Sequence, residues 1–187
     1  KIFLYGGEKN SAAILNNDEI LIFEESQKCQ QKKLPHLEKP IFIACTNYSF
    51  FALCLSGKVY EYKISDDTNS DLEFKEVKEL LEDKIISISG TSLHCVAIGE
   101  KGDIYVQGSN EYGQIIPLED HSSFSPKFIK INDEIKNKIQ IKGAIRNVYA
   151  GKTHTIFQNN EGQIISCGQN SLNELLCCKN NLYKSFA

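Results

Sequence analysis

The chain has no methionine and no tryptophan among its 187 residues, and it contains only four prolines. It also lacks a run of about 20 apolar residues, the length that a membrane-spanning helix needs. Its most apolar window, Ile41 to Leu55, is interrupted by the sequence Thr-Asn-Tyr-Ser. No basic-then-apolar leader is present, so we expect neither secretion nor a membrane partner. Because a complete translated chain starts with methionine, we expect this sequence to be an excerpt of a longer one.

The short motifs of enzyme active sites are absent as well. The chain has no Gly-x-Ser-x-Gly elbow, no phosphate-binding glycine loop, no dinucleotide-binding motif and no His-Glu-x-x-His. The acidic stretch Ser65 to Glu73 does not match a calcium loop, because the glycine at the sixth position and the glutamate at the twelfth are missing. We therefore expect no catalytic residue, no cofactor and no metal site, and the chain is not predicted to be an enzyme.

Charge and cysteine content restrict the partners and the compartment. The net charge is −3, and the lysines are interleaved with acids instead of forming a basic face. This pattern is typical of solubilising surface charge, so we expect no nucleic-acid partner. The seven cysteines are an odd number and include no Cys-x-x-Cys spacing. Free thiols in a reducing compartment, the cytoplasm or the nucleus, are the better interpretation.

What the sequence does contain is a repeated unit, clearest in Gly90 to Ile116. An apolar strand at Cys95 to Ile98 is followed by a turn at Gly102, a second apolar strand at Ile104 to Val106, and a loop bounded by glycines from Gly108 to Gly113. A single hairpin of this kind is marginal in water, so its stability requires further copies.

Three further copies align with this unit. Counted along the chain, the unit at Gly90 to Ile116 is the third copy. It matches the fourth copy well, because His94 and His154 are each followed by glycines at the same two offsets. These glycines are Gly102 and Gly108 in the third copy and Gly162 and Gly168 in the fourth. The first two copies are weaker: Asn10 and Ser49 take the histidine place, and Asp18 and Gly57 take the place of the turn glycine.

Each of the last three copies has a lead-in that reads as an extended segment, a charged turn and an alternating strand. Each unit then has about four strands, the size of a propeller blade. The pattern Gly-x-x-His, apolar strand, Gly, apolar strand, Gly-x-Asn-x-x-Gly-Gln resembles the regulator of chromosome condensation repeat over nearly the whole chain. The resemblance implies an all-β fold: a partial β-propeller of about four blades, each a four-stranded antiparallel sheet, from a ring of seven.

We expect residues 1–187 to form a single array of repeats, with approximate units 1–30, 31–70, 71–122 and 123–181. Because four blades cannot close such a ring, we expect the remaining blades in the same parent chain; a second copy or another partner is the alternative source. Leu72 to Leu81 could form a short amphipathic helix, but the repeat register favours extended structure for Phe74 to Val77. The main insertion, Asn132 to Gly143, could add a hairpin.

The repeated positions are expected to serve the fold. They are Gly7, Gly57, Gly90, His94, Gly102, Gly108, Gly113, Gly151, His154, Gly162 and Gly168. His94 and His154 could be read as a base or as metal ligands. A residue that recurs at one place in successive blades is normally structural, and in the family that this chain resembles the histidine is a packing feature. We therefore expect each histidine to bridge backbone groups at the start of its own strand.

Variable loops on a rigid scaffold usually carry binding, so the first hypothesis is a protein-interaction or adaptor propeller. The resemblance implies the same role, because many members of this repeat family are adaptors. The alternative, the activity of the family's founding member, is guanine-nucleotide exchange on a Ran-like small GTPase. Its candidate residues are the loop acids Asp120, Asp133 and Glu134. A third hypothesis is a regulatory propeller in a larger enzyme.

Overall fold

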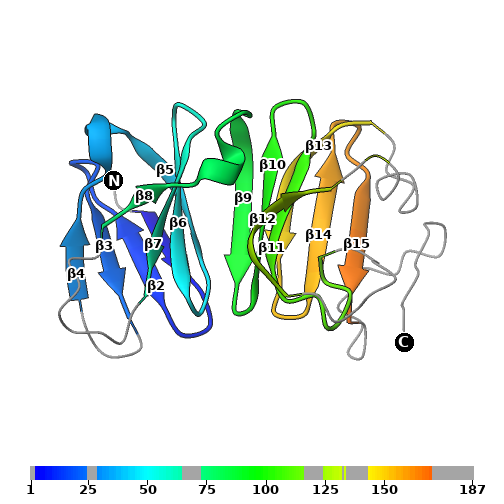
Figure 1. Ribbon diagram of the computed structural model, residues 1–187, viewed down its shortest axis with the longest axis horizontal. Helices are drawn as coiled ribbons and strands as arrows, with labels where there is room; N and C mark the ends of the chain where they lie inside the picture. Colours follow the sequence, from blue (N-terminus) through cyan, green and yellow to red (C-terminus); the bar gives the residue numbers. More distant parts are fainter. Residues whose placement is uncertain are drawn as a thin grey trace.

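The computed structural model describes residues 3–24, 29–64, 73–115, 124–131, 133 and 143–169. They form four antiparallel sheets that follow one another along the chain (Figure 1). The first holds β1 (Phe3–Gly6), β2 (Ser11–Ile14), β3 (Ile20–Phe23) and β4 (Cys29–Lys32). The second holds β5 (Pro40–Cys45), β6 (Ser49–Cys54), β7 (Val59–Lys63) and β8 (Lys75–Glu76). The third holds β9 (Ile85–Thr91), β10 (His94–Gly99), β11 (Ile104–Gly108) and β12 (Ser125–Lys130), and the fourth holds β13 (Ile145–Ala150), β14 (His154–Asn159) and β15 (Ile164–Gly168).

The central sheets are covered on both faces, which explains their continuous apolar strands. Every residue of β6 is buried. Phe50 and Ala52 pack in a core shared with the first sheet, whereas Phe51 and Leu53 pack in a core shared with the third. Because alternate side chains of a strand point to opposite faces, a strand between two sheets needs apolar residues at every position. The strand β10 follows the same rule.

The fourth sheet has a different pattern, because among the described residues only the third sheet covers it. Along β14, buried and half-buried residues alternate from His154 to Asn159. Phe157 lies in the core shared with β10 and β11, while Ile156, on the other face, is half-buried. The first and fourth sheets thus form the two ends of the stack, as Figure 1 shows. The predicted all-β, partial-propeller fold is confirmed.

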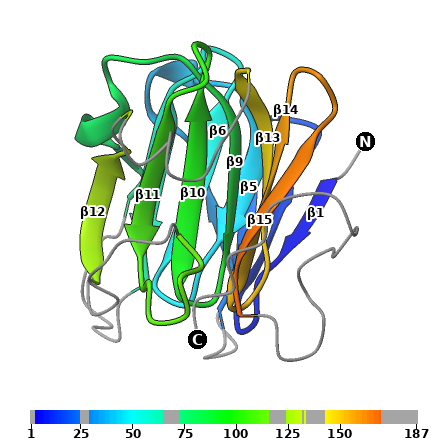
Figure 2. The same ribbon diagram turned by 90° about the vertical axis from the view of Figure 1, so that its right-hand side faces the viewer.

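The first strand of each sheet lies on the inside of the assembly. The strand β9 lies between β5 and β13, and β5 also contacts β1 and β2. Two serine hydroxyls of β9 accept backbone N–H groups of β13: Ser87 from Val148 at 3.3 Å and Ser89 from Ala150 at 2.9 Å. Figure 2 shows β12 at the outer edge of the third sheet. Inner strands that pack on one another with outer strands at the rim are the arrangement of propeller blades.

The sheets are offset from the sequence units. The segment Lys75–Glu76 is extended, as expected, but it pairs with β7 as the outer strand of the second sheet. Likewise β12, at the start of the fourth sequence unit, pairs with β11 of the third sheet. Single 3-10 turns, η1 (Pro35–Leu37) and η2 (Lys78–Leu80), follow β4 and β8. Of the insertion Asn132 to Gly143, only Asp133 and Gly143 are described.

The hairpins between second and third strands have one backbone conformation in common. All four contain a residue with positive φ, namely Asp18 (62°), Gly57 (89°), Gly102 (84°) and Gly162 (81°). Glycine adopts this conformation without steric cost, and aspartate is among the few other residues that tolerate it. The alignment of Asp18 with the three glycines is therefore correct in the structure.

Candidate functional site

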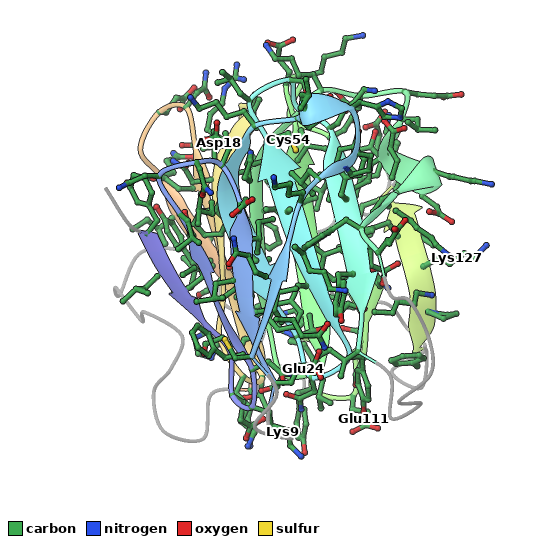
Figure 3. The ribbon with its side chains drawn as sticks, turned by 90° about the vertical axis from the view of Figure 1, so that its left-hand side faces the viewer. Lys9, Asp18, Glu24, Cys54, Glu111 and Lys127 are labelled. Carbon is green, nitrogen blue, oxygen red and sulfur yellow. The ribbon has the colours of Figure 1, made fainter. Side chains whose placement is uncertain are left out.

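The antiparallel order of the sheets places equivalent turns at the same end of the molecule. One end holds the turns between first and second strands, which we call the Glu8 end. These turns are Gly7–Asn10, Thr46–Ser49, Thr91–His94 and Gly151–His154. Figure 3 shows Lys9, Glu24 and Glu111 at this end, with Asp18 and Cys54 at the opposite end.

The carboxylate of Glu8 joins turns from different sheets. Its Oε1 lies 2.6 Å from Nζ of Lys152 in the fourth sheet, and its Oε2 accepts a hydrogen bond of 2.6 Å from the Ser92 hydroxyl of the third. The Asn47 backbone N–H of the second sheet donates to the Ser92 carbonyl at 2.8 Å. Hydrogen bonds from Lys152 and Ser92 lower the pKa of Glu8 from 4.5 to about 2. The carboxylate is therefore ionised at neutral pH, and one acid links the turns of all four sheets.

The repeated histidine of the third sheet contacts the fourth sheet. His94 is buried, and its Nε2 lies 2.8 Å from Oγ1 of Thr155. Because the Thr155 hydroxyl donates to the Gln114 carbonyl at 2.5 Å, its oxygen accepts from Nε2, so Nε2 carries the proton. Burial, followed by the nearby charge of His154, lowers the pKa of His94 to about 4. The side chain is thus a neutral bridge between two sheets, and not a bridge at the start of its own strand as the sequence suggested.

The glycines opposite the histidines allow a close approach of the backbone. Gly108 pairs with His94 and Gly168 with His154 across neighbouring strands. A Cβ atom on Gly108 would lie 2.1 Å from the Leu93 carbonyl oxygen, and one on Gly168 would lie 2.3 Å from the Thr153 oxygen. Of the other repeated glycines, Gly7 and Gly151 lie in first turns, Gly90 in β9, Gly57, Gly102 and Gly162 in hairpins, and Gly113 in the loop after β11.

Three exposed aromatic side chains lie in or next to loops at the Glu8 end. Tyr48 in a first turn and Phe124 at the start of β12 are each 59% exposed, and Tyr112 in the loop after β11 is 44% exposed. The opposite end exposes leucines, including Leu55 and Leu81, together with Phe3 at the start of β1. Aromatic residues are enriched where proteins bind one another, whereas leucine is not a typical hot-spot residue. The sequence patterns did not single out these three aromatics, because each stands alone in a loop.

The candidate loop acids do not form a site in the described part of the chain. Asp133 is exposed and comes shortly after Lys130, which pairs with Asp103 at the opposite end (2.7 Å). Asp120 and Glu134 lie outside the described residues. Within the described ranges, no group of three or more His, Cys, Asp or Glu side chains could hold a metal ion. Nor does that part of the chain contain a helix with the length and apolar character that crossing a bilayer requires.

The chain is similar to several known proteins in sequence or in fold. No protein-family model matches the chain. Protein RCC1 of Candida albicans is 28% identical over 98 residues, which cover 52% of this chain and 21% of that protein. The probable E3 ubiquitin-protein ligase HERC6 of Homo sapiens is 24% identical over 198 residues, which cover 94% and 19%. Among solved structures, human WBSCR16 has a TM-score of 0.71 at 15% identity, covering 90% of this chain and 47% of that one. Yeast RCC1 (Prp20), solved with Kap60, has a TM-score of 0.64 at 16% identity, covering 90% and 43%.

The repeats are of the RCC1-like β-propeller type. The RCC1-like pattern thus extends from the sequence to the arrangement of the sheets. The chain spans about a fifth of the length of the two curated relatives and less than half of the two solved propellers. In a further structure, of Prp20p from Saccharomyces cerevisiae, the reported work includes that protein's binding properties to Gsp1p and histones.

Proposed function

We propose that this chain is a protein-interaction propeller that carries no catalytic chemistry of its own and binds its partner at the Glu8 end. The observation that carries the proposal is the set of three exposed aromatics, Tyr48, Tyr112 and Phe124, at the end where one carboxylate ties the turns together. Large aromatic side chains on a fixed scaffold bind with little loss of conformational entropy. We place this activity inside the cell, in the cytoplasm or nucleus, which agrees with the free cysteines of the described residues.

One relative in particular supports a protein partner. Yeast RCC1 (Prp20) was solved with Kap60, and its binding properties to Gsp1p and histones were reported with another structure of it. A regulatory propeller within a larger enzyme is a related form of the same proposal, because HERC6 is named as a probable ubiquitin-protein ligase and this chain covers 19% of it. In either form, the chain contributes recognition and the chemistry belongs to other segments or to the partner.

Site-specific photocrosslinking tests this proposal and does not require the partner to be identified first. A photoreactive phenylalanine analogue replaces Tyr48, Tyr112 or Phe124 in separate variants, and Leu55 or Leu81 in the controls. After illumination in cells, we expect discrete adducts from the aromatic positions and weak or no adducts from the two leucines. Adducts formed only from the leucine positions, or from none of the five, would contradict the proposal.

The second candidate function is guanine-nucleotide exchange on a Ran-like GTPase. It is favoured by the relative named RCC1 and by the reported binding of Prp20p to Gsp1p. Exchange factors of this kind act by binding, so the candidate shares the protein-binding surface and adds a consequence for the bound nucleotide. Release of fluorescent GDP from a Ran-type GTPase separates the two: acceleration supports exchange, and binding without acceleration supports the adaptor.

A further inference from the structure

A cleft of about 220 Å³ lies between the second and third sheets at the Glu8 end. Its lining includes Ser49, Phe51 and Glu61 from the second sheet and Cys95, Gln107 and Pro126 from the third. Two of the exposed aromatics, Tyr48 and Phe124, also line it. The volume is smaller than the pockets of about 300–1,000 Å³ that hold drug-sized ligands, so the cleft suits a single side chain.

The repeat explains why the cleft exists at this junction. In the second sheet, Phe50 and Tyr62 point toward the first sheet and pack edge to face with centroids 6.2 Å apart. The strand registers place Cys95 and Gln107 at the equivalent positions of the third sheet. Two aromatic rings are thus replaced by a thiol and an amide, and the space that the rings would fill stays open.

The next junction also lacks aromatic residues at these positions but is filled in another way. Thr155 and Cys167 of the fourth sheet are the equivalents of Cys95 and Gln107. Here the backbone carbonyl of Gln114 approaches both: it accepts from the Thr155 hydroxyl, and it lies 3.4 Å from Sγ of Cys167. Side-chain size alone therefore does not leave a cleft, whereas the junction between the second and third sheets keeps the accessible space described above.

The cleft contains a carboxylate where the first and third sheets have an aliphatic side chain and the fourth has Ser166. Glu61 stands at the position that is Ile22 in the first sheet and Val106 in the third, both of them buried. The Glu61 side chain is only 19% exposed; Oε1 accepts a hydrogen bond of 2.7 Å from Ser49, while Oε2 has Lys63 at 3.9 Å. A largely buried carboxylate is costly to desolvate without a close cationic partner. Lys63 is a weak partner, because its side chain is 70% exposed and lies at the long distance of 3.9 Å.

We propose that this cleft receives an arginine side chain from the protein partner, with the guanidinium paired to Glu61 and its planar face or alkyl stem against Tyr48 and Phe124. The proposal rests on the proposed function, because it names the chemistry of the partner at the same end. Arginine meets both features of the cleft: it binds a carboxylate through two N–H groups, and it stacks on aromatic rings. The chain's own acidic stretch Ser65 to Glu73 contains no cation that could take this place.

Selection from a library of random linear peptides tests the proposal directly. Peptides are selected on the full chain and measured by fluorescence anisotropy against four proteins: the parent, Glu61→Gln, Gln107→Tyr and Glu82→Gln. Glu61→Gln keeps the shape and can still accept from Ser49. Gln107→Tyr restores the ring that the second sheet has at Tyr62 and fills the cleft without changing charge. Glu82, exposed at the opposite end, provides the matched control.

We expect the enriched peptides to share an arginine whose replacement by glutamine weakens binding by at least about tenfold. Glu61→Gln should cause a similar loss, the two changes together should cost no more than either alone, and Glu82→Gln should bind like the parent. Gln107→Tyr should also lose binding while it remains folded by thermal unfolding. Peptides without a shared basic residue, equal binding to Glu61→Gln, or no enrichment would overturn the arginine proposal. Crosslinks from Tyr48 or Phe124 in that event would leave the interaction proposal standing.

Discussion

Glu8 and Lys152 are 144 residues apart in sequence, yet their side chains meet at 2.6 Å. The contact joins the first turn of the first sheet to the first turn of the fourth, with the Ser92 hydroxyl of the third sheet on the same carboxylate. Since the contact depends on the positions of all the sheets between them, it reports on the assembly of the whole array.

Replacing Glu8 by glutamine should therefore destabilise the array in a pH-dependent way. The pKa of Glu8 is lowered to about 2, so its contribution is fully present above its ordinary value of 4.5 and is lost as the pH falls from there toward 2. The thermal unfolding midpoint of Glu8→Gln should lie below that of the parent at neutral pH, and this difference in midpoint should vanish at low pH. An unchanged difference across this window would contradict the account of Glu8.

His94 predicts a second, separate pH window. Burial lowers its pKa from 6.5 to about 4, so the unfolded chain binds a proton more readily than the folded one between these values. Neutral His94 therefore contributes its full share to the free energy of unfolding above pH 6.5. This contribution falls by roughly 3 kcal/mol as the pH falls toward 4. The free energies of unfolding of the parent and His94→Gln, measured with denaturant, should converge as the pH falls through this range. Parallel stability curves would show that His94 does not titrate in the way its burial implies.

Gly108→Ala should be much more damaging than Gly113→Ala. Both glycines have positive φ, but a Cβ on Gly108 would lie 2.1 Å from the Leu93 carbonyl oxygen, whereas one on Gly113 meets nothing within 4 Å. We expect a loss of about 3 kcal/mol or more in the free energy of unfolding for Gly108→Ala. Gly113→Ala should lose about 1 kcal/mol, from backbone strain alone. Equal losses would mean that the close approach at Gly108 is not maintained.

The described cysteines should differ in reactivity. Cys29 is exposed, while burial raises the pKa of the Cys45 and Cys54 thiols to about 12 and raises that of Cys95. Because the thiolate is the reactive form, brief alkylation of the native protein followed by peptide mass spectrometry should label Cys29 first. Labelling of Cys45 or Cys95 at the same rate would indicate that the cores around them open readily.

The hairpins could be predicted from sequence because their determinants are local. The alignment of Asp18 with Gly57 rests on neighbouring strands alone, and both residues adopt positive φ. The continuous apolar run of β6 likewise follows from coverage of both faces. The grouping of strands into sheets was harder to predict, since β8 pairs backward with β7 although its segment reads as a lead-in to the next unit.

The features at the Glu8 end could not be predicted in the same way. The contact of Glu8 with Lys152 depends on how four sheets are arranged, and no local pattern encodes that arrangement. Glu61 did leave a signal: an acid occupies an inward repeat position that is Ile22 in the first unit and Val106 in the third. Comparing inward positions across the aligned copies would have identified it from the sequence alone.

Hydrogen–deuterium exchange of the chain with and without its crosslinked partner tests the central claim most directly. The account predicts that binding protects the backbone around Tyr48 and Tyr112 at the Glu8 end. The hairpins that contain Gly57 and Gly102 at the opposite end should exchange as in the free chain. Protection confined to those hairpins, with Tyr48 and Tyr112 unaffected, would contradict binding at the Glu8 end.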